Sequence, residues 1–245
     1  MRPLLALDFD GVICDSLDEC LVSAVNAHAR LRGRTTLVRR PDELDPDLVA
    51  RFRVHRHLVR GAGEYETLLH WLRTRDDDPS PATFAEAVRL RAADVIAFQP
   101  VFFIVRTALR SADPAAWTAL HRHYAEAAAS WDELCDAREV HLVTTKDLAS
   151  VRHFNDVWHL ALADDHLHTC ERFVSKAGGV RELAGRRGVQ PKAVTFVDDH
   201  PLHLADVAAT GARCLWASWG YASTAPEWPA LANLAALLIP EGCPA

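Results

Sequence analysis

Short apolar runs alternate with longer amphipathic segments over the first and last parts of the chain. The runs have the length of buried strands and are bounded by polar turns. We predict strands at Leu4–Phe9, Glu139–Thr145, Glu171–Val174, Ala193–Val197 and Arg213–Trp216. Alternation of such strands with helices is typical of an α/β fold, here a doubly wound, Rossmann-like parallel sheet with helices on both faces.

Apolar residues at helical spacing predict the helices between these strands. A helix from Ser16 to Leu31 follows the first strand, and Ser16 is its candidate N-cap. Gly211 is placed to end the last helix, because glycine readily adopts the left-handed conformation there. The later helices are expected over Asp147–Leu162, Gly179–Arg187 and Leu202–Thr210.

The long segment between the first two strands differs, because helical periodicity dominates it. Proline-bearing breaks separate its helical stretches, Glu64–Leu72, Pro81–Val95 and Pro114–Leu134. Val101–Val105 is an exception that suits either a strand or a buried helical turn. We therefore predict a core domain of residues 1–16 and 138–245 and a smaller helical cap domain of residues 17–137.

The composition narrows the classes of protein to be considered. Of 245 residues, 49% are hydrophobic and 24% charged, which suits a soluble globular protein. The net charge of −6 disfavours nucleic acid as a partner. No run of about 18 apolar residues predicts a transmembrane helix, so we expect no membrane partner, and Met1–Asp10 lacks the long uncharged stretch of a secretory signal.

The cysteines indicate a reducing compartment. No Cys-x-x-Cys pair occurs, and scattered cysteines in a chain of this size are typical of reduced thiols in a cytoplasmic protein. The six residues are Cys14, Cys20, Cys135, Cys170, Cys214 and Cys243.

Four polar clusters follow predicted strands or strand-like segments. In an open parallel sheet the carboxyl ends of the strands face one crevice, so residues far apart in sequence converge there. Crowded carboxylates repel one another unless a cation lies among them, and oxygen ligands suit Mg²⁺. The clusters are Asp8-Phe9-Asp10-Gly11-Val12, Thr144-Thr145-Lys146, Ser175-Lys176 and Asp198-Asp199.

At these clusters the sequence resembles the haloacid dehalogenase superfamily of phosphohydrolases. Asp8-Phe9-Asp10-Gly11-Val12 is similar to its first motif, and Thr144 to its second. Lys176 is similar to the third motif and Asp198-Asp199 to the acidic fourth, followed by Gly211. The helical insert resembles the cap that many members place between the first two motifs.

Two departures from the family pattern concern the third and fourth motifs. Asp198-Asp199 stands where many members have Gly-Asp, and His203 where an acid or Asn often falls. Ala177-Gly178-Gly179 follows Lys176 in place of a frequent proline. How Asp198 and Asp199 share metal binding is left open by the motif.

The resemblance implies catalytic roles that agree with the chemistry of the side chains. Asp8 is the candidate nucleophile, because a carboxylate in line with phosphorus can form an acyl-phosphate. Asp10 is the candidate general acid and base. Thr144 and Lys176 would bind the equatorial phosphate oxygens, where transition-state charge is spread.

The same resemblance implies Mg²⁺ as cofactor. Its ligands would be Asp8, the backbone carbonyl of Asp10, and the Asp198 and Asp199 pair. Gly11 would let the backbone approach the phosphate closely, because it has no side chain. Thr145 is a further candidate contact to the phosphate.

A basic run in the predicted cap allows two interpretations. It is either a solvated helix face or a cap element that recognises an anionic substrate, in which case Arg56 and Arg60 are the candidate substrate-binding residues. The run comprises Arg53, His55, Arg56, His57 and Arg60.

His166, His168 and Cys170 raise the possibility of zinc. Alternate residues of an extended segment share a face, but structural zinc usually needs four ligands and the sequence shows no second ligand pair. We interpret this segment as a polar loop.

The predicted function is Mg²⁺-dependent hydrolysis of a phosphate monoester on a small phosphorylated metabolite, in a monomer or homodimer. Phosphoryl transfer, as in mutases of the same family, would use the same residues. Dehalogenation is disfavoured by Asp10, because the family's dehalogenases resemble this motif without that acid. A non-catalytic binding module is disfavoured by the intact first and fourth motifs.

Overall fold

A computed structural model describes residues 2–34, 37–223, 225 and 227–238 and divides the chain into two compact units. The core unit is formed by Met1–Asp15 with His123–Ala245, and the cap unit by Ser16–Arg122. The chain thus returns to the core unit at His123, whereas the predicted cap domain extended to residue 137. The reason is that the helix at Ala125–Ala137 packs against the central sheet rather than against the cap helices. Cys243 lies outside the described residues.

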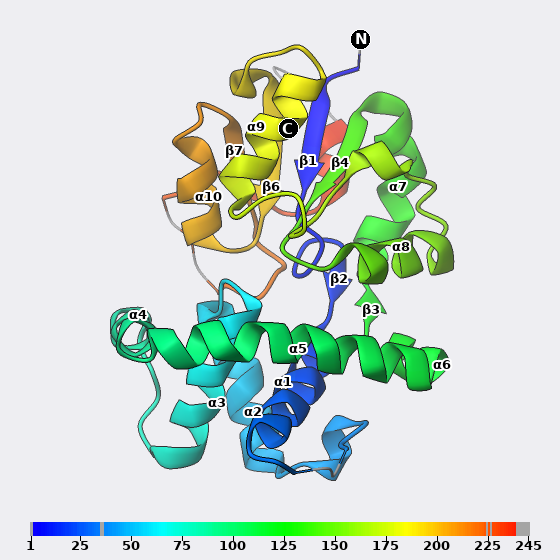
Figure 1. Cartoon of the computed structure of the whole chain (residues 1–245). Helices are drawn as coiled ribbons and strands as arrows, with labels where there is room; N and C mark the ends of the chain where they lie inside the picture. Colours follow the sequence, from blue (N-terminus) through cyan, green and yellow to red (C-terminus); the bar gives the residue numbers. More distant parts are fainter. Residues whose placement is uncertain (1, 35–36, 224, 226, 239–245) are drawn as a thin grey trace. The chain divides into compact units, whose positions relative to one another are not determined.

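The core unit is built on a parallel sheet of strand order β5-β4-β1-β6-β7-β8 (Figure 1). β1 pairs with β4 on one side, Leu7 opposite Leu142, and with β6 on the other, Leu7 opposite Val197. The α/β fold predicted from the sequence is confirmed. The strands are β1 (Leu4–Leu7), β4 (Glu139–Val143), β5 (Leu167–His168), β6 (Val194–Asp198), β7 (Arg213–Ala217) and β8 (Ala230–Leu231). A separate small sheet joins β2 (Cys14–Asp15) and β3 (Arg122–His123).

Helices cover both faces of this sheet, because the strands carry apolar side chains on each face. Leu4, Ala6 and Phe196 form a buried core with the apolar residues of α9 and α10. α7 packs against β4, and α8 against β5. The helices are α7 (Ala125–Ala137), α8 (Leu148–Val157), α9 (Lys176–Arg186) and α10 (Pro201–Ala208), with 3₁₀ turns at Asp164–His166, Pro191–Ala193 and Leu234–Leu238.

The cap unit is helical, as predicted. Its interior contains an ion pair: the Arg106 Nη2 of α5 lies 2.8 Å from the Glu19 Oε2 of α1, and both side chains are buried. Ser23 donates a further hydrogen bond of 2.6 Å to Glu19. The helices are α1 (Leu17–Leu31), α2 (Pro46–His55), α3 (Tyr65–Thr74), α4 (Pro81–Leu90), α5 (Ala92–Ala112) and α6 (Pro114–Thr118), with 3₁₀ turns at Pro41–Glu43, Arg56–Leu58 and Ala62–Glu64.

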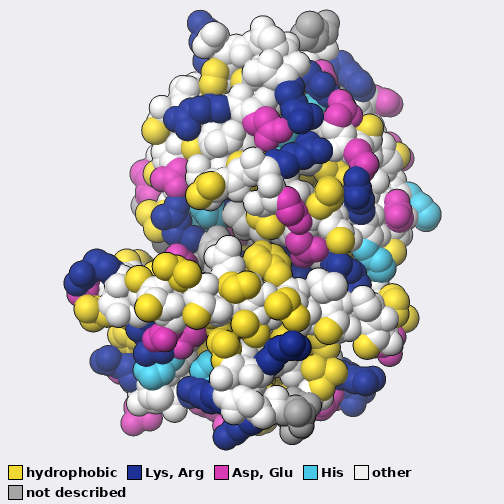
Figure 2. All heavy atoms as spheres, in the orientation of Figure 1, with side chains coloured by type: hydrophobic (Ala, Val, Ile, Leu, Met, Phe, Trp, Pro, Cys, Tyr) yellow, Lys and Arg dark blue, Asp and Glu magenta, His cyan; other side chains and the backbone are white. Residues whose placement is uncertain are grey.

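α5 is long and apolar enough to cross a membrane by length and composition alone, whereas the sequence pattern predicted no such helix. Phe98 and Phe102 on one side of α5 are buried in the cap unit, while Ile96 and Ile104 are exposed. Hydrophobic side chains accordingly gather along this helix in the space-filling view (Figure 2). The same helix also carries the buried Arg106, which forms the ion pair with Glu19.

Several local predictions are corrected by the structure. Val101–Val105 is part of α5, so its apolar residues form helix rather than strand. Glu171–Val174 is not a strand; the adjacent strand is β5, which ends at His168. Two predicted helical stretches are interrupted: the first, Pro81–Val95, at Arg91, and the second, Pro114–Leu134, by β3. Leu17–Leu31 agrees with the predicted helix.

Candidate active site

The carboxyl ends of β1 and β6 bring Asp8 close to the Asp198-Asp199 pair. Because Leu7 lies opposite Val197 in the parallel register, Asp8, directly after β1, lies beside Asp198, the last residue of β6. The Asp8 amide donates a hydrogen bond of 2.9 Å to the Val197 carbonyl, which fixes this position. All three carboxylates are buried, and one oxygen from each lies within 4.8 Å of the others.

Lys176 bridges two of these carboxylates from the first turn of α9. Its Nζ lies 2.6 Å from Asp8 Oδ2 and 2.6 Å from Asp198 Oδ2. The helix begins here rather than at the predicted Gly179, because the Ser175 side chain caps it by accepting a hydrogen bond from the Gly178 amide. Lys176 therefore follows a helix N-cap and not the end of a strand, yet it reaches the carboxylates as the sequence predicted.

The electrostatics of this group are set by burial. Burial raises the pKa of Asp8, and Asp198 adds to the increase, while Lys176 opposes both. Burial alone would lower the pKa of Lys176, but Asp198 and Asp8 outweigh it and raise that pKa. The ammonium is therefore firmly charged, and a further cation would help to keep Asp8 ionised.

Asp199 is held in a tight cradle between two glycines. A Cβ on Gly11 would lie 2.5 Å from Asp199 Cγ, and one on Gly220 would lie 2.2 Å from Asp199 Cβ. The Tyr221 amide donates a hydrogen bond of 2.8 Å to Asp199 Oδ2, and the Trp216 indole donates one of 3.1 Å to the Asp199 carbonyl. Gly11 thus has a role that the motif did not predict: its missing side chain makes room for a carboxylate.

We expect Gly11→Ala to disrupt this cradle. Gly11 has a φ of +84°, where an L residue is strained by about 1–2 kcal/mol, and the new Cβ must in addition displace Asp199. Gly211→Ala is a matched control, because Gly211 has a φ of +89° and a Cβ added there would meet nothing within 4 Å. Both variants should lose stability in thermal unfolding, but only Gly11→Ala should also lose catalytic activity. Equal activity in the two variants would show that the cradle is not required.

The carboxylate group fits a hard divalent cation. Asp8 Oδ1 is a buried oxygen without a hydrogen-bond partner among the described residues, and buried acceptors are seldom left in this state. The donor atoms are carboxylate oxygens, the type that Mg²⁺ prefers. Asp198 is already engaged, since its Oδ1 accepts 2.8 Å from the His200 amide and its Oδ2 lies 3.5 Å from His203 Nδ1.

A second lysine, Lys146, contacts both Asp10 of the first motif and Thr144 of the second. Lys146 Nζ lies 3.1 Å from Asp10 Oδ1, and its side chain is fully buried. Thr144 is buried at the carboxyl end of β4, and its Oγ1 accepts a hydrogen bond of 3.2 Å from the Lys146 amide. Thr145 follows it, partly exposed. The sequence placed Lys146 in the polar cluster but assigned it no role; its position directly after Thr144-Thr145 was the available signal.

Arg56 and Arg60 belong to the cap unit, so the geometry of the core site does not include them. The basic run is not one helix face, because α2 ends at His55 and a 3₁₀ turn follows. Arg56 Nη1 donates 2.9 Å to the Val59 carbonyl, and the Arg60 amide donates 2.7 Å to Glu64 Oε2. Their role in substrate binding remains a prediction.

Comparison with known proteins supports the fold. No family model matches the sequence, and no curated protein matches it either. Among solved structures, the chain is similar to a haloacid dehalogenase-like family hydrolase from Streptococcus pneumoniae, with 14% identity, 96% of this chain and 97% of that chain covered, and a TM-score of 0.60.

Two other solved structures are similar over nearly their whole length. A predicted phosphoglycolate phosphatase from Haemophilus somnus has 14% identity, covers 97% of this chain and 96% of its own, and has a TM-score of 0.60. CbbY from Rhodobacter sphaeroides, in complex with phosphate, has 16% identity, covers 98% and 100%, and has a TM-score of 0.58. The chain therefore has the fold of haloacid dehalogenase-like hydrolases.

Proposed function

We propose that the protein is a Mg²⁺-dependent phosphatase that hydrolyses a phosphate monoester of a small molecule. The observation that carries the proposal is Asp8 Oδ1 at the carboxyl end of β1: it is buried, has no hydrogen-bond partner among the described residues, and belongs to the carboxylate beside the ammonium of Lys176. A nucleophilic carboxylate needs one oxygen that is not engaged in hydrogen bonds and a positive environment to accept a dianionic group. The names of the similar structures, a hydrolase and a phosphatase, support the same reaction class.

In the first step, an oxygen of Asp8 forms a bond to phosphorus while the bond from phosphorus to the leaving oxygen breaks. Asp10 gives its proton to that oxygen, so the alcohol leaves neutral. The product is an acyl-phosphate on Asp8. Lys176 and Thr144 bind the phosphoryl oxygens and stabilise the charge that develops on them.

In the second step, water attacks the phosphorus of the acyl-phosphate. Asp10, now ionised, takes a proton from the water, and the bond between phosphorus and Asp8 breaks to release inorganic phosphate and the free carboxylate. Lys146, 3.1 Å from Asp10 Oδ1, positions the Asp10 carboxylate for both transfers. A Mg²⁺ held by Asp8, the Asp10 carbonyl and the Asp198 and Asp199 pair would neutralise charge between the phosphate and Asp8.

We expect the purified chain to hydrolyse p-nitrophenyl phosphate only when Mg²⁺ is present. Excess chelator should lower kcat/KM by at least about 10²-fold, since the cation contributes several kcal/mol to the transition state. Added Mg²⁺ should restore the rate. Undiminished turnover in excess chelator would contradict the metal requirement, and absence of turnover on a panel of phosphorylated metabolites would contradict the proposed reaction.

The panel should include phosphoglycolate, because one similar structure carries the name of a phosphatase for that compound. Release of inorganic phosphate should equal the loss of substrate. A deficit, matched by a phosphorylated alcohol or sugar acceptor, would instead identify a phosphotransferase.

A further inference from the structure

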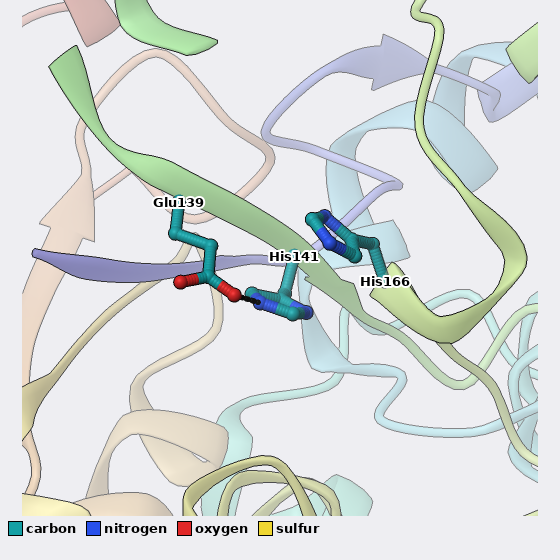
Figure 3. Close-up of side chains that lie close together, drawn as sticks. All are labelled: Glu139, His141 and His166. Carbon is teal, nitrogen blue, oxygen red and sulfur yellow. Dashed lines mark hydrogen bonds and ion pairs between the residues drawn. The ribbon is translucent and has the colours of Figure 1, made fainter. Parts of the chain in front are cut away.

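A second group of metal-ligating side chains lies outside the carboxylate group, on β4 and on the 3₁₀ turn that leads into β5. In β4, Glu139 and His141 are two residues apart and therefore share a face. β5 pairs with β4 in the register Leu142 opposite Leu167, and His166, the last residue of the 3₁₀ turn before β5, lies beside His141. Figure 3 shows the Glu139 and His141 side chains of β4 next to His166. Glu139 and His141 of β4 thus supply, next to His166, the further ligands that the sequence did not reveal.

The distances within this group suit a small cation. Glu139 Oε1 lies 3.3 Å from His141 Nε2, and the rings of His141 and His166 have centroids 4.2 Å apart. One ligand atom from each of the three residues lies within 4.8 Å of the others. Zinc–nitrogen bonds of about 2.0–2.1 Å in a tetrahedral site place neighbouring ligand atoms roughly 3.3–3.4 Å apart, close to the Glu139–His141 separation.

Hydrogen bonds to the opposite ring nitrogens orient both imidazoles. His166 Nδ1 donates 2.8 Å to the Val140 carbonyl, so the lone pair of the neutral ring is on Nε2. His141 Nδ1 lies 3.4 Å from Nε2 of the buried His168. A backbone carbonyl on the second nitrogen, as at His166, is a usual arrangement around a metal-bound histidine. His168 is thus a buried strand residue, and the predicted polar loop is wrong at this position.

From these contacts we propose that Glu139, His141 and His166 bind a zinc-class divalent cation. Two imidazole nitrogens and one carboxylate oxygen form a donor set that suits Zn²⁺ and leaves a fourth position for water. The side chains of Glu139 and His166 are 18% and 22% exposed, so an ion and its water have access from solvent. The site differs in ligand type from the oxygen-only group at Asp8, Asp198 and Asp199.

Neighbouring charges permit this binding. Arg187 Nε lies 2.5 Å from Glu139 Oε1, and its Nη2 lies 3.3 Å from Asp165 Oδ2. Arg187 and His141 both contact Oε1 of Glu139. Because a carboxylate has about four lone-pair sites on its two oxygens, Glu139 can accept from Arg187 through Oε1 and bind the ion as well. Glu139 and Asp165 carry two negative charges against the single positive charge of Arg187, so these three side chains are negative in sum before the ion binds. When the ion binds, the His141 proton moves from Nε2 to Nδ1 and donates to His168, whose own proton then resides on Nδ1, so both rings stay neutral.

Zinc binding to the intact chain tests the proposal. The protein is stripped with chelator, returned to buffer with saturating Mg²⁺ to occupy the oxygen-rich site, and titrated with Zn²⁺ against a fluorescent chelator. We expect one Zn²⁺ per chain, and a loss of affinity of at least about 10²-fold in His141→Ala and in His166→Ala, since even an outer-shell change costs 10–100-fold. His159→Asn, which removes an exposed histidine outside the group and keeps a residue that tolerates its φ of 53°, should bind normally.

A measurement on the unmodified chain covers the case in which the buried His141 variant fails to fold. X-ray absorption of the Zn²⁺-loaded wild type should show two imidazole ligands among four nitrogen or oxygen donors. Absence of stoichiometric binding, an absorption spectrum without imidazole, or unchanged affinity in folded His166→Ala would each overturn the proposal. Zinc that binds only when Mg²⁺ is omitted would place the ion at Asp8 and not at this site.

Discussion

Asp8→Asn should abolish turnover while leaving the core unit folded. The amide is a far weaker nucleophile than the carboxylate, and loss of a nucleophile lowers kcat by about 10⁴-fold or more in covalent enzymes. The fold should survive because Asp8 and Asp198 are two buried carboxylates that share one ammonium. Neutralising one of them removes a repulsion that burial has made costly.

Steady-state kinetics on p-nitrophenyl phosphate and thermal unfolding, measured on the same preparation, check both parts of this prediction. Asp136→Asn on the exposed side of α7 makes the same chemical change away from the site and should leave kcat unaltered. Substantial turnover by Asp8→Asn would exclude the covalent route. A variant that is inactive because it is unfolded would be recognised from its thermal transition, and it would contradict the electrostatic part of the argument.

The sequence predicted those parts of the fold that depend on local pattern. Apolar runs such as Leu4–Leu7 and Val194–Asp198 identify strands because their residues are buried on both faces of the sheet. β5 and β8 were missed, since two residues carry no periodicity. Val101–Val105 could not be assigned from its apolar residues alone, because a strand and a buried helical turn look alike over that length.

At the candidate site, the sequence predicted which residues converge but not how they are held. The ends of parallel strands meet by topology, and this places Asp8 beside Asp198 and Asp199. The contact between Lys146 and Asp10 depends on the path of the chain after β4, and the cradle of Asp199 depends on Gly220, far along the chain. No local pattern indicates either. The group of Glu139, His141 and His166 was hidden for the same reason, since its members come from β4 and from the 3₁₀ turn before β5.

Lys176→Met should cause the largest loss of stability among simple substitutions at the site. The flexible Met side chain fills similar space, but Asp8 and Asp198 then remain as two buried carboxylates without the ammonium that lies 2.6 Å from each. Removing one partner of a buried ion pair destabilises a protein by about 3–5 kcal/mol. Activity should fall as well, since the variant loses a positive charge beside the phosphoryl group.

Denaturant unfolding at several pH values and Mg²⁺ concentrations tests the cause of that loss. Burial already raises the pKa of Asp8 above its ordinary value of 3.8, and Lys176 is the group that opposes this. A carboxyl whose pKa is raised in the folded state destabilises the fold as pH rises, so Lys176→Met should regain stability when the pH falls from about 8 to about 5.5.

Mg²⁺ should stabilise this variant more than the wild type, because a cation among the carboxylates replaces part of the missing charge. Lys192→Met, at an exposed position of the same unit, should change stability by less than about 0.5 kcal/mol and show neither dependence. If the stability of Lys176→Met responded to neither pH nor Mg²⁺, the loss would come from packing, and the carboxylate group would not be the proposed cation site.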